Sequence, residues 1–88
     1  MNNQEYFEIK KHINNRLKDA REKHRYTVRE LAEIAEMSHT YLSNLENNHV
    51  AKPSLYTYLK LFEILEISPG KLFYEIENLP PFDNQNKE

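Results

Sequence analysis

Glu33, Glu36 and His39 are the residues whose types and spacing come nearest to acid-base catalysis. Carboxylates and an imidazole three residues apart can share one face of a helix and exchange a proton. Here that interval crosses a helix break expected before Ser38. The sequence also has no glycine-rich phosphate loop and no turn of the kind that exposes a nucleophilic serine. We therefore expect no enzyme activity.

Metal and redox chemistry have equally little support in the sequence. A zinc site needs clustered ligands or two histidines four residues apart, and neither arrangement occurs among His12, His24, His39 and His49. The absence of cysteine excludes disulfides and thiolate ligands, so stability has to come from packing. We expect neither a metal nor a cofactor.

Basic residues gather in the first third of the chain. Eight Lys and Arg residues stand against two acidic residues between Lys10 and Arg29, although the formal net charge of the whole chain is −2. A basic face on an acidic body suits a polyanion such as nucleic acid, and the alternative is an ordinary solvated helix surface. With no apolar run of about 18 residues and no secretory signal in "MNNQEYFEIKK", we expect a cytoplasmic protein without membrane contact.

Apolar residues recur at helical intervals in five segments, which predicts an all-α protein. The expected helices cover about residues 6–24, 28–35, 38–46, 55–65 and 70–76. Each of the last four follows a residue that commonly caps a helix; these are Thr27, Ser38, Ser54 and Ser68. In the fourth helix the expected core residues are Leu55, Tyr58, Leu59, Phe62 and Leu65. We predict one domain over residues 1–78 and a polar tail over residues 79–88.

The second and third helices are joined by a very short turn. Ala32 provides a small side chain where two helices can cross, and Met37 can fill the turn. Leu42 and Leu45 can then hold the third helix against the core. Such a pair exposes the first half of its second helix, and an α-helix fits the major groove of duplex DNA.

The strings "RLKDAREKHRYTVRELAEIAEMSHTYLSNLE" and "KPSLYTYLKLFEILEISPGKLF" carry a resemblance to a known family. From Ile13 to Tyr74 the chain resembles the phage-repressor-like helix-turn-helix domains of the Cro/CI or XRE type. The resemblance implies a five-helix, lambda-repressor-like fold that binds double-stranded DNA. The chain differs from the family pattern at Glu36, where glycine is usual in the turn, and at Val28, where a glutamine often contacts phosphate.

The resemblance also implies roles for individual residues. Base-contacting positions correspond to His39, Thr40, Ser43 and Asn44. DNA-backbone positions correspond to Thr27, Arg29, Ser38, Tyr41, Asn47 and Lys52. Several of these residues have a structural alternative: Thr27 and Ser38 can serve as helix caps, Tyr41 as a core residue and Asn47 as a helix stop.

A homodimer on a palindromic operator is the function expected from the resemblance, because one short helix reads too little DNA for useful specificity. The residues expected at the dimer interface are Leu72, Phe73, Tyr74, Ile76, Leu79 and Phe82, and the alternative is that they complete the monomer core. We predict a transcriptional repressor of the phage, antitoxin or restriction-controller kind. The alternative function is a module that binds another regulatory protein, which the net negative charge and Glu36 favour.

Overall fold

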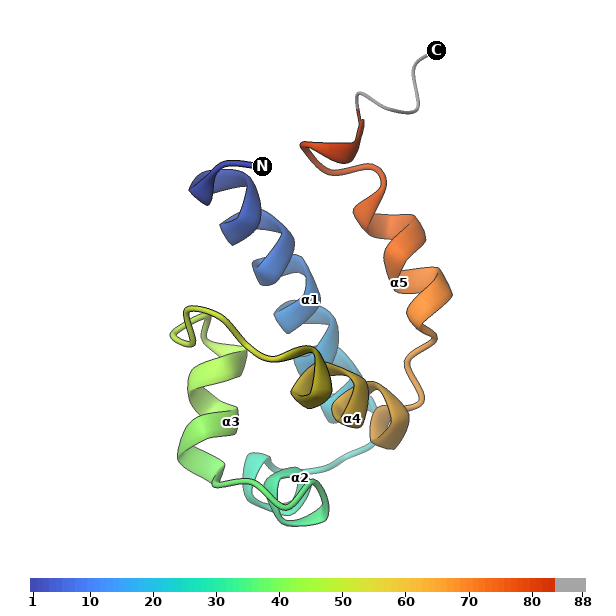
Figure 1. Cartoon of the computed structure of the whole chain (residues 1–88). Coiled ribbons are helices and arrows are strands. Elements are labelled where there is room, and N and C mark those ends of the chain that lie inside the picture. Colours follow the sequence, from blue (N-terminus) through green and yellow to red (C-terminus); the bar gives the residue numbers. More distant parts are fainter. Residues whose placement is uncertain (84–88) are drawn as a thin grey trace.

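The computed structural model describes residues 1–83 and contains five α-helices in that range (Figure 1). The helices are α1 (Asn3–Lys23), α2 (Val28–Ile34), α3 (His39–Glu46), α4 (Leu55–Leu65) and α5 (Pro69–Ile76). The all-α prediction is confirmed. Residues 84–88 of the predicted polar tail lie outside the described residues.

Short-range hydrogen bonds set the helix starts. The predicted caps act as caps: the hydroxyl groups of Thr27, Ser38, Ser54 and Ser68 each accept a hydrogen bond from a backbone N–H in the first turn of α2 to α5. Helix α1 begins at Asn3, earlier than the predicted start near Tyr6. The cause is a reciprocal pair of hydrogen bonds between Asn2 and Glu5, which satisfies two backbone N–H groups at the helix start.

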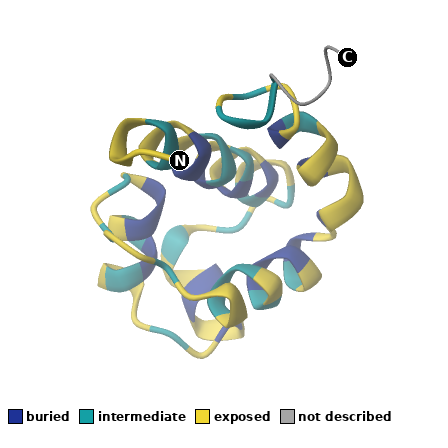
Figure 2. Cartoon of the chain, turned by 45° about the horizontal axis from the view of Figure 1, so that its top comes forward, coloured by how far each residue is buried: buried dark blue, intermediate teal, exposed yellow. Residues whose placement is uncertain are grey.

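Every helix supplies leucine to a single core. The fully buried leucines are Leu17 of α1, Leu31 of α2, Leu42 and Leu45 of α3, Leu61 of α4 and Leu72 of α5. Burying each of these side chains contributes about 1.5–3 kcal/mol. Figure 2 shows the buried side of each helix turned toward the shared interior. The core therefore fixes α2 and α3 against the longer α1.

Helix α4 turns a different side to the core from the one predicted. Leu55 and Leu59 were expected to be buried, but their exposed fractions are 66% and 44%. Leu61 is fully buried instead, beside Phe62 and Leu65. Both arcs of this helix are apolar, so the periodicity alone cannot say which one meets α1.

The first half of α1 holds the loop between α3 and α4. The Lys10 ammonium is buried and donates to the backbone carbonyls of Val50 at 2.9 Å and Ala51 at 3.2 Å. The Tyr6 hydroxyl also donates to the Ala51 carbonyl, at 3.1 Å. These bonds connect residues 40 or more positions apart in the sequence, so α1 restrains a loop that carries part of the predicted site.

Asn14 makes a second long-range link from α1. Its side chain is fully buried, donates to the Asn48 side chain at 2.9 Å and accepts from the Tyr58 hydroxyl at 2.8 Å. Burial raises the pKa of Tyr58 well above its usual value, so the hydroxyl stays protonated as a donor. One buried amide thus joins α1, the loop after α3, and α4.

Helix α5 is attached to α1 by a carboxylate that accepts two hydrogen bonds. The same Glu75 oxygen lies 2.7 Å from His12 Nε2 and 3.2 Å from Arg16 Nε. The hydrogen bond from His12, followed by the positive charge of Arg16, holds the pKa of Glu75 below its usual value of 4.5. Glu75 is therefore ionised in the folded chain at neutral pH.

This contact predicts a loss of stability in acid. Because the pKa of Glu75 is lower in the folded chain than in the unfolded one, its contribution is present above pH 4.5 and is lost as the pH falls through the folded-state pKa. We expect the wild-type chain to have a higher urea midpoint than Glu75→Gln at pH 6, and the difference to shrink below pH 4.5. A difference that is constant down to pH 3 would contradict this linkage.

Most of the residues predicted for a dimer interface are already used by the monomer. Leu72 and Ile76 are buried in the core. Their assignment to an exposed dimer interface is therefore corrected, and the stated alternative, that they complete the monomer core, applies to them. Leu79 and Phe82 pack partly buried against the same core. Of this group, only Phe73 and Tyr74 are largely exposed.

Candidate nucleic-acid interface

Helices α2 and α3 form a packed pair joined by a sharp turn. Ala32 and Leu31 of α2 are buried beside Leu42 of α3, and Met37 in the turn packs against the core. The Met37 N–H donates to the Ala32 carbonyl at 2.9 Å, which closes the turn. The prediction of two helices meeting at a turn is confirmed, with Ala32 and Met37 at their expected places.

The outer side of α3 is polar and accessible. His39, Thr40 and Asn44 are exposed and Ser43 is half-buried, whereas Leu42, Leu45 and Glu46 are buried. At about 100° per residue, the four predicted base-contacting residues occupy one arc of roughly 140°. They form no side-chain hydrogen bond with residues 1–83. The fold thus brings His39, Thr40, Ser43 and Asn44 together on one open surface.

The six residues predicted to contact the DNA backbone lie at the start of α2, in α3 with its two caps, and in the loop after α3. Thr27, Arg29, Ser38, Asn47 and Lys52 are exposed, while Tyr41 is half-buried against the core. The Thr27 and Ser38 hydroxyls accept hydrogen bonds from the Glu30 and Tyr41 N–H groups, both at 3.0 Å. These two residues therefore act as caps, and the Asn47 amide is likewise engaged, donating to the Ser43 carbonyl at 2.9 Å.

Glu36 occupies the left-handed backbone conformation in the turn. Its φ is 56°, a value at which a side chain with a Cβ costs roughly 1 kcal/mol relative to glycine. The backbone strain expected from a glutamate in place of glycine at position 36 is therefore present. The α2–α3 contacts and the Met37 hydrogen bond hold the turn in place despite it.

Replacing Glu36 by glycine is therefore expected to stabilise the chain. The predicted gain in the free energy of unfolding is about 0.5–1 kcal/mol, less than the full strain because glycine also gains freedom in the unfolded state. Glu36→Ala is the matched control, since it removes the charge but keeps the Cβ. Urea unfolding measures both variants, and equal stability of the alanine and glycine variants would disprove the backbone explanation.

A buried ion pair fixes the end of α3. Arg21 of α1 and Glu46 of α3 make two parallel hydrogen bonds, from Nε to Oε2 at 2.7 Å and from the second guanidinium nitrogen to Oε1 at 3.0 Å. The third nitrogen of Arg21 donates to the Tyr26 carbonyl at 2.8 Å. The hydrogen bond to Glu46 raises the pKa of Arg21. Arg21 thus ties α3 and the approach to α2 to the same point on α1.

The pairing of Arg21 with Glu46 cannot be predicted from the sequence pattern. In the sequence, Arg21 is one of the eight cations of the basic run, and Glu46 is the last residue of a predicted helix. The sequence shows only that a carboxylate directly follows Leu45 at the end of a helix anchored by leucines. Identifying its partner requires the fold.

The basic run is much less available to a polyanion than its composition indicates. Lys10 binds backbone carbonyls, Arg16 pairs with Glu75, and Arg21 pairs with Glu46. The remaining five cations are exposed and form no ion pair within the described residues; they are Lys11, Lys18, Lys23, Arg25 and Arg29. Only Arg25 and Arg29 flank the start of α2, so the charge next to α3 is modest.

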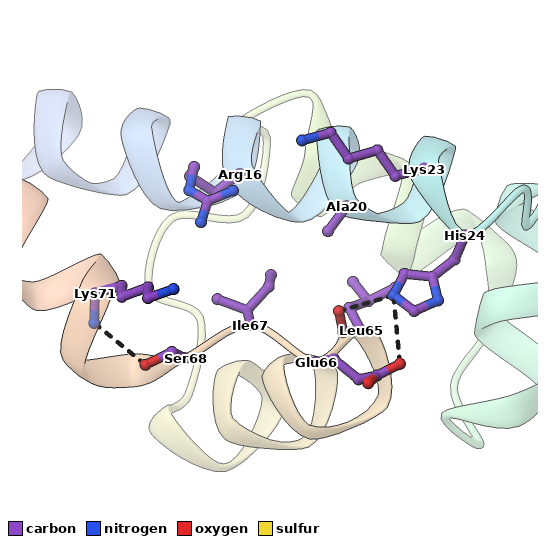
Figure 3. A pocket seen from close by; sticks show the side chains of 9 residues that line it. All are labelled: Arg16, Ala20, Lys23, His24, Leu65, Glu66, Ile67, Ser68 and Lys71. Atoms are coloured by element: carbon purple, nitrogen blue, oxygen red, sulfur yellow. Dashed lines mark hydrogen bonds and ion pairs between the residues drawn. The ribbon is translucent and has the colours of Figure 1, made fainter.

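Part of the basic run faces α5 instead. Arg16 and Lys23 of α1 line a pocket of about 250 Å³ together with Lys71 at the start of α5 (Figure 3). His24 closes one end, where its Nε2 lies 2.9 Å from the Leu65 carbonyl and 3.9 Å from the Glu66 carboxylate. These cations therefore belong to the contact between α1 and the connection from α4 to α5, and α3 does not line this pocket.

Acidic side chains are exposed on α2 and in the turn that leads into α3. Glu30 and Glu33 of α2 and Glu36 of the turn are all exposed. Hydrogen bonds with Thr27 lower the pKa of Glu30, so this carboxylate is charged at neutral pH. A polyanion approaching α3 has to avoid these three carboxylates, which favours close and well-directed contacts over general electrostatic attraction.

The five-helix core, the closed turn and the open polar side of α3 define a helix-turn-helix DNA-binding domain. The helix-turn-helix family model matches residues 17–72, and the chain belongs to this family. The predicted relationship to phage-repressor-like domains of the Cro/CI or XRE type is thereby confirmed, and it makes the chain a DNA-binding transcriptional regulator. Searches of curated proteins and of solved structures give no match.

The matched residues leave out the start of α1. Tyr6, Lys10, His12 and Asn14 all precede residue 17, and all make the long-range contacts described above. These residues hold the α3–α4 loop and α5 in place. Within residues 1–83 there is no group of three or more acidic residues or histidines arranged to hold a metal. In the same range no helix is long and apolar enough to cross a membrane.

Proposed function

We propose that the chain is a sequence-specific repressor that binds a palindromic operator as a homodimer, with α3 in the major groove. The observation that carries this proposal is the division of α3 into a buried apolar side and an open polar side. An α-helix of this kind fits the major groove, where base edges present distinct patterns of donors and acceptors. Two copies read half-sites about 34 Å apart. A cytoplasmic location follows from this role.

Each residue on the polar side has a chemistry suited to its place. Asn44 can make the two-pronged hydrogen bond that selects adenine, and His39 can donate to a guanine acceptor or a phosphate. Thr40 and Ser43 can donate to or accept from either kind of base. Arg29 and Lys52 carry the positive charge for the DNA backbone, while the start of α3 offers its free N–H groups to a phosphate.

Selection of bound duplexes from a random pool tests this proposal. We expect an enriched sequence with two-fold symmetry and half-site centres about one helical turn apart. With two charged backbone contacts per protomer, the logarithm of the binding constant should fall with the logarithm of salt concentration with a slope of about −4. Failure to enrich any sequence at low salt would refute sequence-specific binding.

A module that binds another regulatory protein is the second candidate. Two observations favour it: the carboxylates of Glu30, Glu33 and Glu36 beside α3, and the engagement of Lys10, Arg16 and Arg21 inside the fold. Such a module would bind a basic protein surface through α2 and α3. Tight binding to a protein partner combined with failure of the duplex selection would decide for this function.

A further inference from the structure

Helix α4 exposes an apolar surface that the monomer does not use. Leu55, Tyr56 and Leu59 have exposed fractions of 66%, 71% and 44%. Lys60 and Glu63 lie on the same arc of the helix, and with Tyr56 and Leu59 they line a shallow hollow. We call these five residues the α4 face. The core side of the same helix carries Leu61, Phe62 and Leu65, so the α4 face is a second apolar side.

We propose that a second copy of this chain covers the α4 face and that this contact forms the homodimer. The inference rests on the proposed function, because it assigns the interface of the DNA-bound dimer. Exposed leucines and an exposed tyrosine on adjacent turns of one helix are the composition expected of an interface centre. It differs from the sequence prediction, which placed the interface in α5 and the residues that follow it.

The position of α4 suits a dimer that binds two half-sites. Helix α4 follows the loop that carries Asn47 and Lys52, and it lies between α3 and α5 in Figure 1. Helix α5 is on the side of the molecule away from α3, and residues 77–83 lie at the end opposite α2 (Figure 1). A protomer measures 45 Å in its longest dimension. Contact through that far end would hold the two α3 helices farther apart than contact through α4, and successive major-groove faces are only about 34 Å apart.

The charges on the α4 face complement each other under two-fold symmetry. The Lys60 ammonium lies over the Tyr56 ring, 5.5 Å from its centroid, and it pairs with no carboxylate in residues 1–83. Glu63 likewise forms no ion pair in that range. Consider an antiparallel pair of α4 helices with the two-fold axis between Leu59 and Lys60. In this arrangement Tyr56, with the Lys60 ammonium over its ring, lies opposite Glu63 of the second copy. A self-complementary arrangement of this kind is what a two-fold interface requires.

The size of the α4 face predicts a weak dimer that DNA strengthens. An 11-residue helix is about 16 Å long at 1.5 Å per residue. That length is too short for one helix to bury the roughly 800 Å² per partner of a stable interface. Two protomers held on adjacent half-sites are at high effective concentration, so the contact forms readily there. Dimerisation and operator binding are thus coupled, and occupancy of the operator rises steeply with protein concentration.

A groove between α1 and α5 is the rival surface. Its volume is about 440 Å³, and its mostly apolar lining includes Met1, Tyr6, Phe73 and Phe82. Phe73 in this lining and the next residue, Tyr74, are the two exposed residues of the interface that was predicted from the sequence. A dimer formed through this groove would therefore contradict the proposal that the α4 face is the dimer interface.

Cysteine cross-linking separates the two surfaces, since the chain has no cysteine of its own. Leu59→Cys places a thiol near the proposed two-fold axis. Tyr74→Cys is the control, since position 74 is more exposed to oxidant than position 59, at 70% against 44%. We expect oxidation to give a covalent dimer of Leu59→Cys, both in the free chain at high concentration and at lower concentration with the selected duplex. A dimer of Tyr74→Cys alone, or of neither variant, would overturn the proposal.

A charge variant provides a second readout. Leu59→Glu puts two like charges together at the proposed axis, and the fold tolerates it because Leu59 is already partly exposed. We expect binding to a duplex with two half-sites to weaken about tenfold or more, with unchanged binding to a single half-site. Equal effects on both duplexes would contradict the proposed contact. If no duplex is selected, the proposed function fails, and the cross-linking of the free chain still decides where copies of it meet.

Discussion

Glu46→Ala is expected to lower the free energy of unfolding by about 3–5 kcal/mol, since it leaves the Arg21 guanidinium buried without its counter-ion. The side chains of Arg21 and Glu46 are 11% and 5% exposed, so little water can replace the lost carboxylate. Small domains are stable by only about 5–15 kcal/mol. One substitution at the end of α3 is therefore expected to remove a large part of the stability of the fold.

Urea unfolding followed by circular dichroism measures this effect. Glu33→Ala removes an exposed carboxylate that forms no ion pair or side-chain hydrogen bond within residues 1–83, and we expect it to change stability by no more than about 0.5 kcal/mol. The double variant Arg21→Met with Glu46→Leu should recover much of the loss, because it removes both buried charges together. A loss below about 1 kcal/mol for Glu46→Ala would mean that water or relaxation solvates Arg21.

The pair also connects stability with the proposed function. Arg21 holds the end of α3 and the Tyr26 carbonyl just before α2 at the same time. Loosening it allows α3 to shift relative to the start of α2, and contacts with bases tolerate only small displacements. A variant that remains folded is therefore expected to lose DNA specificity as well as stability.

Those features of the fold that depend on neighbours within four residues could be predicted from the sequence. The hydroxyl caps at Thr27 and Ser38, the strained turn at Glu36 and the polar outer side of α3 are all of this kind. Each follows from side chains close in sequence, whose geometry within a helix is nearly fixed. The location of the candidate site was predictable for the same reason.

Features that depend on distant parts of the chain were not predictable. Leu59 was placed in the core and Leu61 was not, because two apolar arcs compete on α4 and only packing against α1 selects between them. The composition of the basic run predicts a charged surface, although Lys10 and Arg21 bind groups 25 to 41 residues away. Leu72 belongs to the monomer core for a similar reason, since its partners come from other helices.

These corrections change what limits the proposed DNA interface. With Lys10, Arg16 and Arg21 engaged in the fold, Arg29 and Lys52 carry most of the charge expected near phosphates. Glu30, Glu33 and Glu36 are exposed on α2 and in the turn, and their charge opposes the approach of a phosphate backbone. General affinity for DNA is thus expected to be weak, so a larger share of operator binding has to come from base contacts made by α3.

Lys52→Ala and Asn44→Ala separate these two contributions. Lys52 is exposed in the loop after α3, and its removal should weaken binding to every duplex alike and reduce the salt slope by about one per protomer. The enriched operator sequence should not change. Mobility shifts at several salt concentrations measure the slope, and a slope equal to that of the wild type would remove Lys52 from the phosphate contacts.

Asn44→Ala should instead change which sequence is preferred. The Asn44 side chain is exposed and makes no hydrogen bond within residues 1–83, so the fold should be unaffected. Loss of a two-pronged contact with adenine costs about 1–3 kcal/mol of discrimination at one base pair of each half-site. Repeating the duplex selection with this variant should leave that position random and its neighbours fixed, with the salt slope unchanged. A selected sequence identical to that of the wild type would show that Asn44 contacts no base, however tightly the chain binds DNA.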